Sequence, residues 1–170
     1  DILEITKRTF ADLKLKEVLA ENYALYLFNA QGVLLYMEGD KGEVGYPATQ
    51  SGTVWSEETV GTNAHVLCIR LKKPYTIIGP EHFCTIFQNS IVSAAPITNE
   101  QGQVIAALVL GVHLYSDPPL GDILYLRHTL GLVKAMAVAV ENGLQLKKSY
   151  TQLRIAHDRQ KTAMALVDEG

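Results

Sequence analysis

With 170 residues, the chain has the length of one ordinary domain, and its 48% hydrophobic and 19% charged residues are typical of a globular protein with a core. This balance excludes a disordered tail, which has few apolar residues and a high net charge. The formal charge of -3 and the pI near 5.9, without a basic run, argue against direct contact with nucleic acid or an anionic membrane.

The cysteines and the chain ends bear on the cellular compartment. Cys68 and Cys84 show no C-x-x-C spacing, so they form neither a disulfide framework nor a zinc motif, and free thiols suit a reducing cytoplasm. The first residues lack the regions of a signal peptide. The longest apolar run, Val104–Val112, falls short of the roughly 20 residues that a membrane span needs. Because the sequence begins without Met and ends on Asp-Glu-Gly, we expect it to be cut from something longer.

The first part of the chain predicts a helix and then a β-hairpin. Apolar residues at near-helical spacing over residues 2–20 predict an amphipathic helix that covers a sheet. Residues 24–29 and 33–37 are aromatic and β-branched runs around Ala-Gln-Gly, which is typical of a hairpin. The first run is apolar at consecutive positions, so both faces of that strand should be covered. The Gly-rich residues 41–53 predict an irregular connection of the kind that often serves as a lid.

The middle of the chain predicts a short helix, a strand and a turn. Thr62 is the expected N-cap of a helix over residues 62–72. We expect residues 74–78 to form a short strand, and residues 81–84 to form a helical turn that brings His82 towards the start of that helix. The helix residues expected to point inward are Ala64, Leu67, Cys68 and Leu71.

A second hairpin is predicted over residues 91–98 and 103–114, joined by Asn-Glu-Gln-Gly. In its second strand both alternating sets of side chains are apolar, which is typical of a strand buried on both faces. The sheet should therefore have helices against one side and a pocket layer against the other.

Residues 121–167 contain no proline and predict one helix, on the order of 60–70 Å long at 1.5 Å per residue. A domain of this size cannot cover such a helix. We therefore expect its second half to pair with its own copy in a parallel dimer. The polar His157 and Gln160 weaken this seam, as suits a signalling helix that has to shift. The seam positions are Leu146, Tyr150, Leu153, His157, Gln160, Met164 and Val167.

Residues 52–96 contain the predicted site. This stretch sets small polar side chains among aromatic and aliphatic ones, as an apolar ligand pocket with a few polar anchors requires. Asn63 and His82 would supply hydrogen bonds. The apolar wall would consist of Trp55, Ile78 and Phe83. Backbone amides at the helix start beside Asn63 would suit a carboxylate or phosphate, but the local residues equally fit a plain helix cap.

A set of four motifs in order resembles the GAF domain of sigma-54-dependent transcriptional activators, above all the acetoin- and dihydroxyacetone-regulator type. The resemblance covers residues 2–150 and is most specific over residues 52–114. It implies an α+β, PAS-like fold with a central antiparallel β-sheet, terminal helices on one face and a ligand pocket on the other. The motifs are Trp55-Ser56-Glu57, Val60-Gly61-Thr62-Asn63-Ala64, Glu81-His82-Phe83 and Ser93-Ala94-Ala95-Pro96-Ile97.

The resemblance implies a cytoplasmic bacterial sensor module that is not an enzyme and carries no cofactor. Its partners would be an unknown small-molecule effector and a second copy bound through the terminal helices, while contact with DNA belongs to domains absent from this segment. The implied parts are an N-terminal helix (1–20), a GAF core (21–121) and a long signalling helix (122–170) that leads to a PAS-like domain. The candidate ligand-binding residues are Trp55, Thr62, Asn63, His65, Ile78, His82, Phe83 and Ser93.

The chain departs from this family where the pocket would lie. Val92 stands where relatives often carry Cys, and His65-Val66 replaces the usual Ile-Gly. These changes alter the shape of the pocket, so no relative's effector can be transferred. They also fit an alternative function, a dimerisation or interaction module whose pocket has filled in.

Two chemical alternatives rest on the histidines and cysteines. His65, Cys68, His82 and Cys84 supply soft ligands for a metal-sensing site, although their spacing matches no zinc motif. Some GAF proteins reduce methionine sulfoxide through cysteines, which requires an exposed thiolate. The predicted inward position of Cys68 argues against such chemistry.

Overall fold

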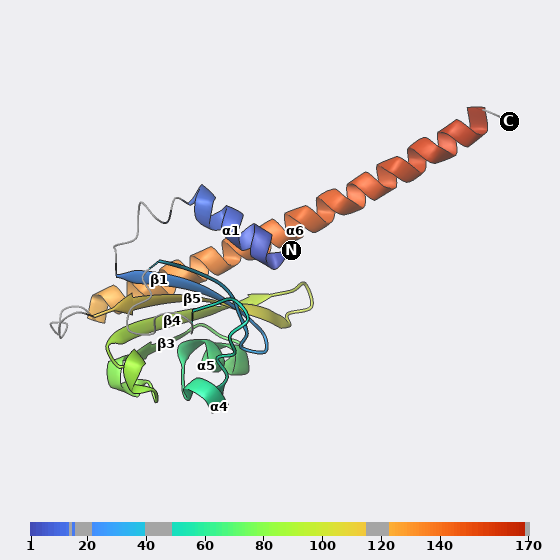
Figure 1. Ribbon diagram of the computed structural model, residues 1–170. Coiled ribbons are helices and arrows are strands. Elements are labelled where there is room, and N and C mark those ends of the chain that lie inside the picture. The colour runs from blue at the N-terminus through green and yellow to red at the C-terminus, as the bar shows by residue number, and fades with distance from the viewer. Residues whose placement is uncertain (14, 16–21, 40–48, 115–122, 169–170) are drawn as a thin grey trace.

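The computed structural model describes residues 1–13, 15, 22–39, 49–114 and 123–168, with the backbone alone for residues 123–127 and 167–168. Its centre is a five-stranded antiparallel sheet in the order β2-β1-β5-β4-β3. One face is covered by two helices, α1 (Ile2–Asp12) and α6 (Ile123–Asp168), and the other by α4 (Glu57–Val60) and α5 (Ala64–Leu71), as Figure 1 shows. The strands are β1 (Tyr23–Asn29), β2 (Leu34–Gly39), β3 (Tyr75–Ile78), β4 (Ser90–Thr98) and β5 (Val104–His113). The predicted α+β architecture is confirmed.

Both predicted hairpins form, and their alternating side chains divide the core into two layers. Leu25 and Leu27 of β1 pack in the layer beneath α1 and α6. Tyr26 and Phe28, one residue out of phase, pack in the layer beside α5. Because successive strand residues point to opposite faces, each central strand contacts both layers at once. Movement of these strands therefore changes the packing in both core layers.

Several helix boundaries differ from those expected. The N-terminal helix α1 ends at Asp12, and residues 14 and 16–20 lie outside the described part. Helix α5 begins at Ala64 with Asn63 as N-cap, so the prediction of Thr62 as N-cap is wrong. Leu71 was expected to point inward but is exposed, because it lies in the last turn of α5 where the helix leaves the sheet.

Two 3-10 turns replace the helical turn predicted at residues 81–84. They are η2 (Gly79–Glu81) and η3 (Thr85–Phe87). Between them His82 has an extended backbone. The first turn lies before the predicted position because the Glu81 carboxylate accepts a hydrogen bond from the backbone N–H of Ile78, at 2.9 Å.

Most of the predicted lid at residues 41–53 lies outside the described residues. Its last part, from Thr49, returns along β2: the backbone N–H of Gly52 donates to the Leu34 carbonyl oxygen at 2.7 Å. The chain then runs into Trp55, whose own N–H donates to the carbonyl oxygen of Gly32 at 2.8 Å. Gly32 has φ +77°, and a Cβ there would lie 2.9 Å from the Trp55 oxygen. Glycine at this turn therefore lets the Trp55 segment dock.

Helix α6 is a single helix of 46 residues. Its first half buries Val133, Met136 and Val140 against the sheet. Its second half projects beyond the domain, as Figure 1 shows, and every described side chain from Ser149 onward is exposed. No described helix is both long enough and apolar enough to cross a membrane.

Candidate functional site

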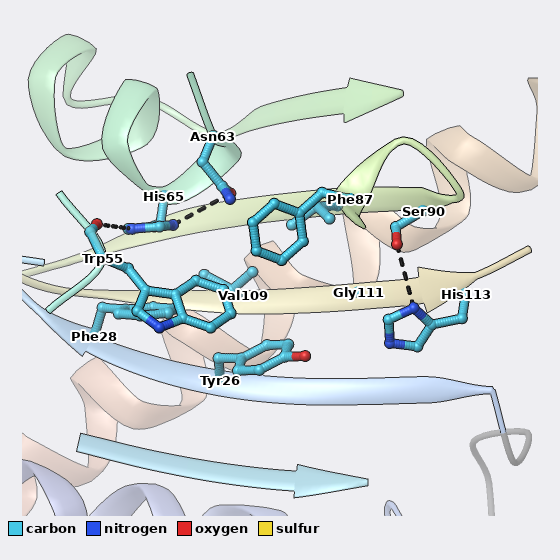
Figure 2. A pocket seen from close by; sticks show the side chains of 11 residues that line it. Tyr26, Phe28, Trp55, Asn63, His65, Phe87, Ser90, Val109, Gly111 and His113 are labelled. Carbon is cyan, nitrogen blue, oxygen red and sulfur yellow. Dashed lines mark hydrogen bonds between the residues drawn. The ribbon is translucent and has the colours of Figure 1, made fainter. Parts of the chain in front are cut away.

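A small cavity lies between β1, β4 and β5 on one side and Trp55, α5 and Phe87 on the other. Figure 2 shows an aromatic middle section with polar groups at its two ends, Asn63 and His65 at one and Ser90 and His113 at the other. The cavity leaves about 20 Å³ for the centre of a water-sized molecule, which is room for about one water. Its lining residues are Tyr26, Phe28, Trp55, Asn63, His65, Phe87, Ser90, Val92, Val109, Gly111 and His113.

The aromatic side chains close the middle of this cavity. The Trp55 ring lies 5.7 Å from that of Tyr26, 5.4 Å from that of Phe28 and 5.3 Å from that of Phe87, each at a tilted angle. These are favourable distances for aromatic pairs. Phe87 comes from the short turn η3 and is itself buried. It therefore occupies the space that a ligand in this layer would need.

His65 is held as a neutral ring at the inner end of the cavity. It is almost fully buried and stacks on Phe28 with ring centroids 4.1 Å apart and an interplanar angle of 8°. Burial lowers its pKa to about 4, against a smaller opposing effect of the hydrogen bond to the Trp55 backbone. Nε2 lies 2.6 Å from the Trp55 carbonyl oxygen, and since that oxygen can only accept, Nε2 carries the proton.

The tautomer of His65 determines the orientation of the Asn63 amide. Asn63 Oδ1 is placed 3.3 Å from His65 Nδ1, and Asn63 makes no side-chain bond to cap its own helix. In the neutral ring Nδ1 is an acceptor, so rotating the amide by 180° brings its NH2 group to this position and forms a hydrogen bond. The amide oxygen is then left to accept a hydrogen bond from another group.

Two further histidines have a buried ring nitrogen without a partner among the described residues. His113 Nδ1 lies 3.2 Å from Ser90 Oγ, and its Nε2 is buried and unpartnered. His82 Nδ1 donates to the Gly79 carbonyl oxygen at 3.0 Å, which leaves Nε2 as a buried acceptor without a donor. Burial lowers the pKa of His82. An unsatisfied buried group costs about 1–3 kcal/mol, so His82 Nε2 is suited to a donor from a ligand or water, and His113 Nε2 to a donor or an acceptor according to its tautomer.

The structure brings together only part of the predicted site. Trp55, Asn63 and His65 line the cavity. His82 is buried next to it, with its ring 6.0 Å from that of Phe87, but is not a lining residue. The position of His82 follows from its extended backbone, which places the ring next to Phe87 and not in the cavity lining.

The other predicted residues lie elsewhere, contrary to our expectation. Ser93 lies on the opposite face of the sheet, because its strand places Val92 and Ala94 in the cavity layer. Phe83 is 77% exposed with its ring against Gly61, and Ile78 is 37% exposed at the end of β3. Thr62 lies in a separate groove beside β3.

Sequence reasoning missed the lining residues that the strands contribute. In β5 the alternation of Val109, Gly111 and His113 places a small residue and a histidine on one face, and this pattern was available. Both faces of the strand are apolar, however, so the pattern alone does not show which face carries the cavity. Phe87 was missed because nothing in its local sequence marks a 3-10 turn.

The cysteines do not support the chemical alternatives. Cys68 is fully buried, and burial raises the pKa of its thiol to about 12, so it stays protonated and is a weak nucleophile. Within the described ranges, no group of three or more histidine, cysteine or acidic side chains is arranged to hold a metal ion.

The chain has the fold of a GAF domain. It superposes on the solved A. aeolicus nlh2 GAF domain with a TM-score of 0.55 and 15% identity, over 86% of this chain and 94% of that one. It also superposes on the E. coli DhaR(N)-DhaL complex structure with a TM-score of 0.72 and 21% identity, over 95% of this chain and 53% of that chain. No family profile matches the sequence.

Two sequence relatives are named as bacterial regulators of transcription, as the motifs predicted. A signal-transduction and transcriptional-control protein of Clostridium beijerinckii is 29% identical over 157 residues, which is 89% of this chain and 23% of the relative. The acetoin dehydrogenase operon transcriptional activator AcoR of Bacillus subtilis is 29% identical over 133 residues, 76% of this chain and 20% of that protein. The chain thus spans about a fifth to a quarter of the curated relatives it matches.

Proposed function

We propose that the chain is the sensory domain of a sigma-54-dependent transcriptional activator, in which occupancy of the aromatic cavity acts through the sheet on α6 and, through α6, on a second copy. The observation that carries this proposal is the position of the sheet. Its central strands line the cavity with Tyr26, Val92 and Val109 and contact the helix layer with the residues between them. A ligand that binds one arrangement of these strands better than another shifts the population of both layers. In this function it would act in the cytoplasm.

The cavity indicates what kind of effector it would accept. Its aromatic middle favours an apolar molecule, and its polar ends offer the Asn63 amide and His113 Nε2 as hydrogen-bond partners. The effector would therefore be a small metabolite with a short apolar body and one or two hydroxyl, carbonyl or carboxylate groups. Since the cavity holds about one water, Phe87 has to move out before such a molecule can enter.

The second half of α6 supports the proposed dimer. The seam positions recur along it at alternating steps of four and three, two of them polar (His157 and Gln160), and the apolar Leu146, Tyr150, Leu153 and Met164 are 59% to 74% exposed. This spacing is that of a coiled-coil seam. Burying each such side chain is worth about 1.5–3 kcal/mol, so a second copy aligned in parallel is the natural cover. A parallel pair also sends both helices in the same direction.

Dimerisation is tested by sedimentation velocity of the chain and two variants. Leu153→Glu puts a charge into the seam and should convert the dimer to monomer. Ile155→Glu makes the same kind of change two residues away, at an exposed position facing away from the seam, and should leave the dimer intact. A monomeric wild-type chain, or equal effects of both variants, would refute the coiled-coil pairing.

Ligand sensing is tested by thermal shift and by fluorescence of Trp55, the single tryptophan of the chain. Small diols, ketones and carboxylates are screened against the wild type and Phe87→Ala. A ligand at about 100 times its Kd stabilises by about 2.7 kcal/mol and should change Trp55 emission. Asn63→Ala should abolish the response without changing the oligomeric state.

A second candidate function is an interaction module, and the small volume of the cavity favours it. The solved E. coli DhaR(N) relative is a complex with another protein, DhaL. In this case the filled aromatic layer serves only as core. No thermal shift with any compound, in the wild type or in Phe87→Ala, together with an intact dimer, would favour this function over ligand sensing.

A further inference from the structure

We propose a second small-molecule site at the free edge of the sheet, suited to a zwitterion such as a small amino acid. The edge groove lies beside β3, which pairs with β4 alone and ends the sheet. It has a volume of about 450 Å³, against about 20 Å³ for the aromatic cavity. A small molecule fits here without displacing a side chain. The residues that matter for the proposal are Thr62, Lys73, Tyr75, Thr76, Glu81 and Leu130.

The charges of the edge groove define the class of ligand. Lys73 is exposed and makes no ion pair with any described residue. The Glu81 carboxylate is held in place by the hydrogen bond from the Ile78 backbone N–H. A ligand with both a carboxylate and an ammonium group complements these two charges, whereas a dianion meets repulsion from Glu81 and a simple cation meets repulsion from Lys73.

Uncharged polar groups in the same groove add hydrogen-bonding capacity. The hydroxyl groups of Thr62 and Tyr75 have no hydrogen-bond partner within the described part of the chain. Both are partly buried, so their positions are constrained by packing. Together with the apolar Pro74 and Ile77 they provide a mixed surface, which is typical of sites for small polar metabolites.

The edge groove contacts α6 both directly and through a chain of hydroxyl groups. Thr76, which lines the groove, lies 2.9 Å from Ser93 Oγ, and Ser93 Oγ lies 3.1 Å from Thr129 Oγ1 of α6. Ser93 and Thr129 are buried among mostly apolar side chains between sheet and helix. Leu130, the next residue of α6, lines the groove itself. A ligand in the groove therefore touches the helix that we propose carries the signal.

This site stands apart from the aromatic cavity. Trp55 lines the cavity and not the edge groove. A ligand in the groove should leave Trp55 emission unchanged, and a ligand in the cavity should alter it. The two proposals can therefore fail independently.

Isothermal titration calorimetry of the whole chain tests the site, with serine and alanine as probes and with propionate and ethylamine as analogues that carry one charge. We expect binding of an amino acid and at least tenfold weaker binding of both analogues. Lys73→Asn should weaken binding at least tenfold. Its matched control is Lys72→Asn, a neighbouring exposed lysine outside the groove with φ 53°, a conformation that asparagine tolerates.

The coupling to α6 is tested by hydrogen exchange of residues 128–141 with and without the bound amino acid. The wild type should show a change in protection, while Ser93→Ala should bind the ligand and show a smaller change, because only the direct contact of Leu130 remains. Absence of heat with either amino acid, equal binding of propionate, or unchanged binding by Lys73→Asn would overturn the site. Binding that persists in Lys73→Asn and alters Trp55 emission would assign the ligand to the aromatic cavity instead.

Discussion

Acidification should destabilise the domain through His65. In the folded chain its pKa is about 4, against an ordinary value of 6.5. Below pH 6.5 the unfolded chain binds a proton at His65 that the folded chain does not bind, so the free energy of unfolding falls with falling pH until about pH 4. Burial is the main cause, since the ring lies between Phe28 and the Trp55 carbonyl oxygen, away from water.

The size of this effect follows from the shift in the pKa of His65. Each unit of difference in pKa corresponds to about 1.4 kcal/mol, so the shift of His65 amounts to about 3 kcal/mol in full and about 2 kcal/mol between pH 7 and pH 5. For a chain of this length, 2 kcal/mol corresponds to a fall in Tm of about 4–8 °C. The buried His82 acts in the same direction, because its pKa is also lowered.

Urea unfolding at pH 7 and at pH 5 measures the effect. His65→Gln keeps a donor for the Trp55 carbonyl oxygen but cannot take up a proton, so its stability should depend much less on pH in this interval. His157→Gln, at an exposed position on the projecting half of α6, should behave as the wild type. Equal stability of the wild type at the two pH values, or parallel loss in His65→Gln, would refute the neutral buried ring.

Two further predictions concern how α6 is held. Gly131→Ala should stabilise the fold by about 0.5–1 kcal/mol through helix propensity, because a Cβ there meets no atom within 4 Å. Gly143→Ala should lose this gain, because its Cβ would lie 2.8 Å from Ile5 Cγ2. Equal shifts in Tm for the two variants would contradict the packing of α1 on α6. Glu141→Gln should cost about 1 kcal/mol, because one carboxylate oxygen accepts from both Thr98 N–H at 2.6 Å and Thr98 Oγ1 at 2.7 Å. Urea unfolding measures the cost, and unchanged stability would mean that the charge contributes nothing.

The regular elements were predictable because each has a strong local pattern. The hairpins follow from β-branched runs around glycine turns, and the projecting helix follows from an unbroken run without proline. The boundary of α5 was not predictable in this way. Thr62 and Asn63 are both good N-cap residues. Asn63 takes the N-cap position because Phe28 and Trp55 hold the His65 ring in place, and the Asn63 side chain lies against that ring.

The site was predictable only where it follows from consecutive residues. Trp55, Asn63 and His65 come together because one segment of chain carries them onto the sheet. Ser93 was assigned to the wrong layer because strand β4 is apolar on both faces, and a shift of one residue moves a side chain to the other side. The motif that contains Ser93 thus marks the interface with α6 rather than the aromatic cavity.

The polar contacts of β4 with α6 determine what kind of motion the helix can transmit. Ser93 meets Thr129, and Thr98 meets Glu141. These contacts are five residues apart on the strand, roughly 17 Å at 3.3 Å per residue, and twelve apart on the helix, roughly 18 Å at 1.5 Å per residue. The helix therefore follows the strand between two fixed points across an apolar surface, which resists sliding but not tilting.

The far end of the helix near Leu166 lies roughly twice as far from Glu141 as Thr129 does. If the Ser93 contact shifts while the Glu141 contact holds, the far end therefore moves about twice as much as Thr129. Glu141→Gln should therefore weaken the movement of the far end on ligand binding while leaving ligand binding intact. A spin label near Leu166 that responds equally to ligand in the wild type and in Glu141→Gln would show that Glu141 is not the pivot.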